Sequence, residues 1–126
     1  MFSQAVQDVL GTPQDVDWGN GTSRRLLIES DGRGYAVTLT TVNPNTTTDL
    51  RYDNHWEACV VTMGSGEVES AQGIVKLLPG VLYAPDRAEA HQVRAGEEGL
   101  VLVCVFNPPL TGEENHQLTP GEPSGY

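Results

Sequence analysis

Short extended runs separated by turn residues occupy most of this chain and limit what it can fold into. The runs are rich in Val, Leu, Thr and Tyr, whereas Gly, Pro, Asn and Asp stand between them. Only residues 2–10 have a brief helical pattern, which leaves no room for helices alternating with strands. The pattern therefore predicts a sandwich or barrel of antiparallel strands. The runs are "RRLLIES", "GYAVTLTTVN", "TTTDLRY", "EACVVTMG", "GEVES", "GIVKLLPG", "VLYAPD", "HQVRA" and "GLVLVCVFNPP".

Length and charge exclude several classes of function. A chain of 126 residues predicts a single domain, residues 1–126. The net charge of −10, with only seven Lys and Arg, provides no basic patch for nucleic acid, and no DNA-reading element is present. The first residues lack the pattern of a signal peptide, and no apolar run is long enough to span a membrane. We expect a cytoplasmic protein with a small-molecule substrate and neither nucleic acid nor membrane as partner.

The cysteines and the last residues carry two further expectations. Cys59 and Cys104 both lie in apolar runs, which is typical of reduced, buried and inert thiols rather than of a disulfide. Residues 113–126 are polar and rich in Pro and Gly. Such a segment is expected to be a flexible closing tail that packs loosely over the barrel or frays.

A histidine and a glutamate stand two positions apart in "RYDNHWEACV". Because successive side chains of a strand point to opposite faces, His55, Glu57 and Cys59 are expected on one face, with Tyr52 and Trp56 on the other. The first face carries groups that bind metals. The segment therefore predicts a polar, metal-binding patch on a strand.

The spacing around this patch resembles the two sequence motifs of cupins. Glu57 is followed after six residues by Gly64, and Gly73 is followed after five by "PG", with Tyr83 three positions beyond. In cupins, the first motif supplies two histidines and a glutamate and the second supplies another histidine, which together hold a metal inside a jelly roll. Here His55 and Glu57 stand in place of the histidine pair, and Tyr83 stands in place of the last histidine. The resemblance implies an all-β cupin jelly-roll barrel of antiparallel strands.

Four longer segments, which together run from Thr22 to His116, resemble ectoine synthases. Members of that family are cytoplasmic, homodimeric, iron-dependent cupins. They close N-γ-acetyl-L-2,4-diaminobutyrate into the cyclic amidine ectoine with loss of water. The resemblance implies Fe2+ as cofactor and Glu57, Tyr83 and His91 as its ligands. The segments are "TSRRLLIESDGRGY", "YDNHWEACVVTMGSGEVE", "LPGVLYAPDRAEAH" and "LVLVCVFNPPLTGEENH".

The chemistry of this ligand set agrees with iron, although each residue has an ordinary structural alternative. A carboxylate, a phenolate and an imidazole suit ferrous iron, whereas two thiolates and a histidine would favour zinc. Glu57 could instead pair with an arginine, Tyr83 could be a core aromatic, and His91 could be an exposed histidine of a hairpin. His55, on the same face as Glu57, is expected to orient its carboxylate.

The resemblance also implies residues that bind and convert the substrate. Arg25 would clamp a carboxylate, and Phe106 would stack on the ring. Glu114 and His116 would reach in from the tail as acid–base groups. Singly, each could be a solvated charge, a core aromatic or an ordinary tail residue. The expected substrate-binding residues are Arg25, Thr40, Tyr52, Cys104 and Phe106, and the expected catalytic residues are Tyr52, Glu114 and His116.

Three positions depart from the family pattern. Gly21 stands where ectoine synthases have a tryptophan, and Thr38 and Leu39 stand where they have an asparagine or histidine followed by a glutamate. Trp18 lies three places before Gly21, in a glycine-containing loop. These changes predict poor turnover of the usual substrate or a preference for a related acylated diamino acid. An iron cupin that acts as an oxygenase or isomerase on another small substrate, or a non-catalytic ligand-binding cupin, would also fit these residues.

Overall fold

Strands make up most of the structure, a computed structural model that describes residues 1–126. They form one antiparallel sheet, with strand order β1-β2-β3-β8-β5-β6, in which β4 also pairs with β8 and β7 with β5. The all-β fold class is thereby confirmed, and the single α-helix is one turn long, so no helix here could cross a bilayer. The elements are α1 (Val6–Val9), β1 (Asp15–Asp17), β2 (Thr22–Leu27), the 3-10 turn Glu29–Asp31, β3 (Ala36–Val42), β4 (Thr47–Leu50), β5 (Trp56–Ser70), β6 (Gly73–Leu77), β7 (Leu82–Tyr83) and β8 (His91–Asn107).

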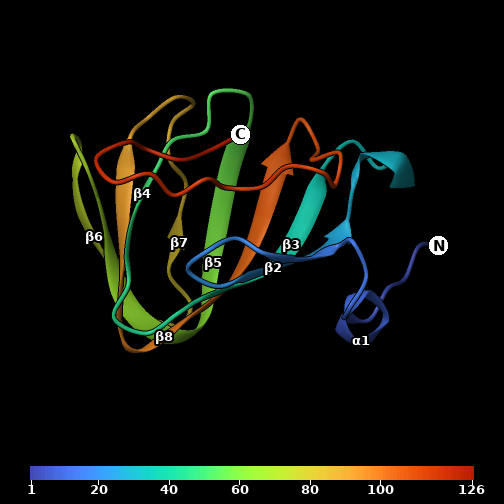
Figure 1. The fold of residues 1–126 in the computed structure, drawn as a ribbon, viewed down its shortest axis with the longest axis horizontal. Coiled ribbons are helices and arrows are strands. Elements are labelled where there is room, and N and C mark those ends of the chain that lie inside the picture. Colours follow the sequence, from blue (N-terminus) through green and yellow to red (C-terminus); the bar gives the residue numbers. More distant parts are fainter.

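Two long strands, β5 and β8, connect the two halves of the fold (Figure 1). They pair with each other along almost their whole length, and the register shifts near Gly64 and Gly66, where both strands bend. One half of the pair continues through β3 and β7, and the other half through β4 and β6. The sheet thus folds over itself and encloses an interior between its halves.

Glycines explain why the sequence pattern divided each of these strands into two runs. Gly64 has φ +86°, and a Cβ there would lie 1.9 Å from the carbonyl oxygen of Gly99 on β8. Only glycine allows the two backbones to approach this closely. A glycine that usually marks the end of a strand here marks a bend within one.

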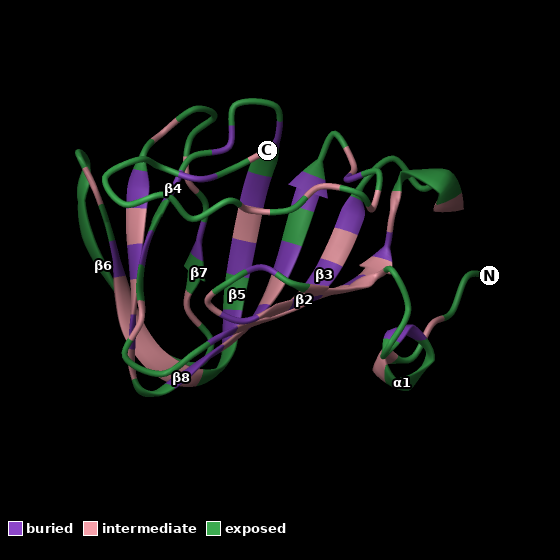
Figure 2. Ribbon diagram, viewed as in Figure 1, coloured by how far each residue is buried: buried purple, intermediate pink, exposed green.

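Buried and more exposed residues alternate along the strands (Figure 2). On β5, Glu57, Cys59 and Val61 are buried, whereas Trp56 and Val60 are exposed. The predicted facing of Glu57 and Cys59 is therefore confirmed. The prediction is wrong for Tyr52, which is 6% exposed, because β5 begins only at Trp56 and the preceding residues bend rather than alternate.

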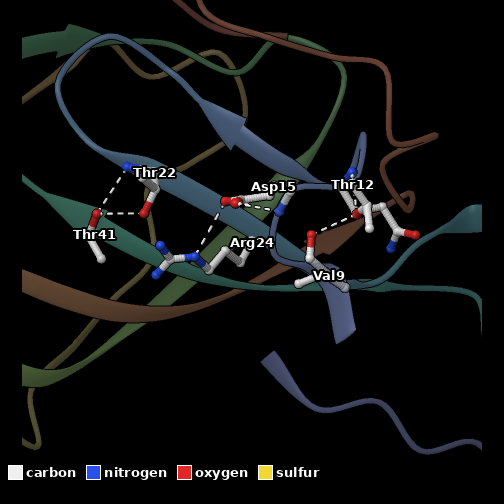
Figure 3. A network of polar contacts seen from close by, with 8 residues as sticks. Val9, Thr12, Asp15, Thr22, Arg24 and Thr41 are labelled. Carbon is white, nitrogen blue, oxygen red and sulfur yellow. Dashed lines mark hydrogen bonds and ion pairs between the residues drawn. The ribbon is translucent and has the colours of Figure 1, made fainter. Parts of the chain in front are cut away.

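Polar contacts fix the edge formed by β1, β2 and β3 (Figure 3). Asp15 faces Arg24 across the β1–β2 pair, with its carboxylate oxygen 3.4 Å from Nε. The hydroxyl of Thr41 accepts a hydrogen bond from the backbone N–H of Thr22 at 2.9 Å. These contacts hold the loop between β1 and β2 against β3, and that loop carries Trp18 to the interior.

The C-terminal segment crosses the open end of the folded sheet, drawn in red in Figure 1. Ser124 is buried, forms a parallel bridge with Leu50 and exchanges backbone hydrogen bonds with Arg51 and Asp49. Tyr126 packs against the apolar core. The segment therefore has defined contacts over the barrel, whereas its flexibility remains a prediction.

Candidate metal and substrate site

A cavity lies between the two halves of the sheet, beneath the C-terminal segment. Most of its walls are apolar or aromatic, and a few polar groups converge on it, which is typical of a small-molecule site. The predicted residues Thr40, Tyr52, Glu57, Tyr83, Cys104, Phe106 and His116 all line it, together with Trp18, Cys59 and Tyr126. Arg25, His91 and Glu114 are not in contact with this cavity.

The sheet brings several of these residues into one row. Directly paired positions run from β7 through β5, β8 and β3 to β2, and paired residues of antiparallel strands share a face. The row explains why residues far apart in sequence meet inside. Its members are Tyr83, Cys59, Cys104, Thr38 and Arg25.

The three predicted metal ligands are buried around the same part of the interior. Glu57 on β5 is 8% exposed, Tyr83 on β7 is 7% exposed and His91 at the start of β8 is 4% exposed. Glu57 and Tyr83 line the central cavity, and Tyr83 together with His91 lines a neighbouring one. Tyr83 thus lines both cavities, one with Glu57 and one with His91.

Two of these side chains have buried polar atoms without a hydrogen-bond partner. His91 donates from Nδ1 to the carbonyl oxygen of Glu89 at 2.9 Å, which leaves Nε2 as a bare lone pair with no partner. Oε1 of Glu57 is also unpartnered. Buried polar atoms are normally satisfied, so both atoms are available to bind a metal ion. The residues present therefore fit a metal centre.

Burial dominates the electrostatics of this site. It raises the pKa of Glu57 to about 7, raises the pKa of Tyr83 well above its usual value and lowers the pKa of His91. Each shift disfavours the charged form of its group. A bound cation would offset the cost of an ionised carboxylate or phenolate here.

The expected contact between His55 and Glu57 is absent. His55 is buried, but its Nδ1 donates to the carbonyl oxygen of Pro108 at 2.7 Å, and its ring lies edge-on to Phe106 at 6.1 Å. The hypothesis that His55 orients the carboxylate is wrong in this structure, because its Nδ1 is bonded to the Pro108 carbonyl and not to Glu57, although His55 is buried like Glu57.

Tyr52 and His116 form a polar pair at the cavity wall. The Tyr52 hydroxyl and His116 Nε2 share a hydrogen bond of 2.9 Å, and His116 Nδ1 lies 2.8 Å from the hydroxyl of Ser124. Burial lowers the pKa of His116 to about 4, and the nearby charge of Arg25 contributes in the same direction. His116 is therefore neutral at physiological pH and is able to accept a proton.

Arg25 and Glu114 connect the barrel to the tail. The Arg25 guanidinium is fully buried and donates to the carbonyl oxygens of Gly112, at 2.8 Å, and of Glu114. The Glu114 carboxylate accepts hydrogen bonds from the Thr111 and Gly112 backbone and the Thr111 hydroxyl. Burial opposes ionisation of Glu114, but these backbone hydrogen bonds outweigh it and lower its pKa. Both residues stabilise the start of the tail, and their roles toward a substrate stay predictions.

Trp18 occupies the cavity wall that Gly21 leaves open. Its indole is 6% exposed, donates from Nε1 to the Thr41 carbonyl oxygen at 3.1 Å and lies edge-on to His116 at 5.6 Å. A Cβ at Gly21 would lie 1.9 Å from that same carbonyl oxygen. A tryptophan at position 21 would therefore clash with β3, whereas Trp18 supplies an indole from three places earlier.

The two other departures from the family pattern differ in position. Thr38 is fully buried and shares a hydrogen bond of 2.8 Å with the hydroxyl of Thr40. Leu39 alternates with them and points to the opposite face of β3. Of the two, only Thr38 faces the interior.

Sequence reasoning missed the role of Tyr126. This residue lines the cavity and lies 4.7 Å from the His116 ring and 5.1 Å from the Tyr52 ring, measured between centroids. A lone aromatic residue in the polar segment 113–126 was the available signal. The polar residues around Tyr126 predicted an exposed tail, although Tyr126 packs into the cavity and holds the tail in place.

Comparisons with known proteins agree with this architecture. An ectoine synthase family model matches residues 1–122. The L-ectoine synthase of Desulfatibacillum aliphaticivorans is 46% identical over 120 residues, 92% of each chain, and that of Bordetella avium is 42% identical over 118 residues, 92% of this chain and 89% of the other.

Solved structures show the same fold. A crystal structure of ectoine synthase from P. lautus superposes with a TM-score of 0.83 at 39% identity, and covers 89% of this chain and 81% of that one. A cupin-2 domain from Rhodospirillum rubrum superposes with a TM-score of 0.65 at 20% identity, covering 81% of this chain and 67% of that one, and supports the fold alone. The chain is a cupin, and it belongs to the ectoine synthase family.

Proposed function

We propose that this chain is an ectoine-forming hydro-lyase that closes N-γ-acetyl-L-2,4-diaminobutyrate into the cyclic amidine ectoine with loss of water. The observation that carries the proposal is the pair of unpartnered buried atoms, Glu57 Oε1 and His91 Nε2, which belong to two neighbouring cavities that Tyr83 also lines, in a member of this family. Ectoine is a compatible solute, so the physiological role would be osmoprotection.

Glu57, Tyr83 and His91 would hold Fe2+ in this proposal. Their carboxylate, phenolate and imidazole suit ferrous iron, and the Glu89 carbonyl already fixes the tautomer of His91 that presents Nε2. Bound iron would supply Lewis acidity toward the acetamide oxygen. The protein itself contributes burial, which excludes competing water from the site.

The remaining cavity residues would fold the substrate for ring closure. Phe106, Cys104 and Thr40 provide an apolar wall with one hydroxyl, which brings the free amine toward the amide carbon. The amine must lose protons as the C–N bond forms, and the amide oxygen must leave as water. The Tyr52–His116 pair is placed to accept and return these protons.

Arg25 and Glu114 take more structural roles in the proposal. The Nε of Arg25 has no hydrogen-bond partner, and its two terminal nitrogens donate to the tail, so Arg25 would neutralise a substrate carboxylate while holding the tail closed. Glu114 would act mainly by forming the turn that presents its carbonyl to Arg25. Glutamine at position 114 would distinguish this role from acid–base catalysis, because it preserves part of the turn but cannot transfer a proton.

The direct test is turnover by the iron-loaded protein. Incubation with N-γ-acetyl-L-2,4-diaminobutyrate should give a product lighter by one water, identified as ectoine by mass spectrometry and co-elution. An analogue with a longer acyl group tests whether a related acylated diamino acid is preferred. Thr38, a buried departure from the family pattern, is the reason to test this preference. Binding of either compound without any product would instead favour a non-catalytic cupin and contradict the proposal.

Substitution of Trp18 by alanine should lower kcat/KM about ten- to a hundredfold, because one large wall of the cavity is lost. Trp18→Phe keeps an aromatic wall without the Nε1 hydrogen bond to Thr41, and should retain most of the activity. Steady-state kinetics of both variants measure the effect. Equal loss in the two variants would assign the effect to the loop and not to the cavity wall.

The proposed enzyme would be a cytoplasmic homodimer. Val60 on β5 and Leu82 on β7 are apolar cross-strand neighbours that are both exposed. Apolar patches of this kind are typical of interfaces, so we place the homodimer contact on this outer face. The two free buried thiols agree with a cytoplasmic protein.

A further inference from the structure

Two cysteines and a glutamate meet at the cavity wall. Cys59 on β5 and Cys104 on β8 are direct cross-strand partners, and their sulfur atoms lie 3.1 Å apart. One carboxylate oxygen of Glu57 and the two sulfur atoms lie within 4.8 Å of one another. All three residues line the same cavity. Three metal-binding atoms thus converge on one point.

An unpartnered atom points to a ligand at this cluster. Glu57 is 8% exposed, faces the cavity, and its Oε1 has no hydrogen-bond partner. A buried carboxylate oxygen without a donor is rare in folded proteins. The predicted iron set contains Glu57 but neither cysteine, so it leaves the dithiol unexplained.

The geometry points to a second metal site, in which Glu57, Cys59 and Cys104 bind a thiophilic divalent cation such as Zn2+. Tetrahedral zinc with Zn–S distances of about 2.3 Å separates two sulfur ligands by roughly 3.8 Å, so the thiols need to move apart only slightly. Thiolate ligands select soft or borderline cations over ferrous iron. Binding releases both thiol protons, and any proton on the Glu57 carboxyl, to solvent and breaks no other bond.

The shared glutamate makes the two sites exclusive. A cation held by Glu57 and the two thiolates occupies the carboxylate on which the proposed iron set depends, and Tyr83 is the cross-strand neighbour of Cys59. Zinc-loaded protein is therefore expected to take up less ferrous iron. Whether the protein holds iron or a thiophilic cation would therefore depend on which of the two is available.

Cadmium titration tests the inference without any measurement of turnover. Cd2+ added to metal-free protein, kept reduced by a phosphine, should bind once per chain and produce an ultraviolet cadmium–thiolate charge-transfer band. Cys59→Val should abolish the band and weaken cadmium binding by about tenfold or more. The same variant retains Glu57, Tyr83 and His91 and should still bind ferrous iron.

Two further variants separate this site from the proposed iron site. Tyr83→Phe should lose iron and keep the cadmium band, whereas Glu57→Gln should weaken both metals. Unchanged cadmium affinity in Cys59→Val, or binding without a thiolate band, would overturn the second site. The outcome for iron in Tyr83→Phe tests the proposed cofactor independently, so failure of one proposal is distinguishable from failure of the other.

Discussion

Alanine in place of Glu57, Tyr83 or His91 is expected to lower bound ferrous iron by about tenfold or more and to remove most ectoine-forming activity. Each substitution deletes one member of a three-residue set, and for Glu57 and His91 the deleted atom is buried without a protein partner. Metal analysis after gel filtration, with a parallel turnover assay, measures both effects. Full iron occupancy in all three variants would contradict the ligand set.

The control for this experiment lies in the same strand. Glu69→Ala removes a carboxylate from an exposed position of β5, where it pairs with Arg94 at the surface, and should leave iron content unchanged.

The stability of metal-free Glu57→Gln shows whether lost iron reflects a lost ligand or a lost fold. Because burial raises the pKa of Glu57 to about 7, its ionised form is disfavoured in the metal-free barrel. Metal-free Glu57→Gln should therefore unfold no more easily than the unsubstituted protein at neutral pH or above.

The strand pattern predicted the fold because antiparallel strands with one buried face carry a period of two. That period is visible from Glu57 to Val61 and places the Glu57 carboxylate inside. It fails at Tyr52, which is buried although the period predicts the opposite face, since the chain bends at Asp53 and Asn54 before β5 begins. The three-residue β1 was missed for a related reason, because Asp15–Asp17 is too short to show a period.

Site residues that are near neighbours in sequence could be predicted, whereas contacts that depend on the pairing of distant strands could not. Glu57 and Cys59 follow from one strand. The contact between Cys59 and Cys104 depends on the register of β5 against β8, which two internal bulges shift. Two buried cysteines in apolar runs gave no sign that their sulfur atoms would meet at a cavity.

The position of a loop residue such as Trp18 could not be predicted from the sequence either. Trp18 reaches the cavity because Gly19 and Gly21 adopt φ values of +108° and +157°, which residues with a side chain rarely adopt. The expected change in substrate preference rested on the absence of a tryptophan at position 21. With Trp18 in the wall and Leu39 on the opposite face, Thr38 is the remaining interior change, so the preference for another substrate stays a prediction with narrower support.

Removal of residues 113–126 should abolish turnover, by about a hundredfold or more, while iron content is retained. The deletion removes His116, Ser124 and Tyr126 from the cavity mouth and exposes Tyr52 to solvent. Water would then compete at a site whose chemistry eliminates water. None of the proposed iron ligands is deleted, and Gly112, whose carbonyl binds Arg25, remains. Turnover and metal analysis of the truncated protein measure the two expectations.

A single substitution keeps this prediction testable if the truncated chain folds poorly. His116→Phe preserves an aromatic ring against Trp18 and Tyr126 but removes the hydrogen bonds to Tyr52 and Ser124. If His116 transfers protons, this variant should lose kcat with little change in KM, because the wall of the cavity remains. A truncated protein with full activity, or His116→Phe with unchanged kcat, would exclude His116 as a catalytic group. Proton transfer would then have to come from Tyr52, whose pKa burial raises well above its usual value, or, in His116→Phe, from Glu114.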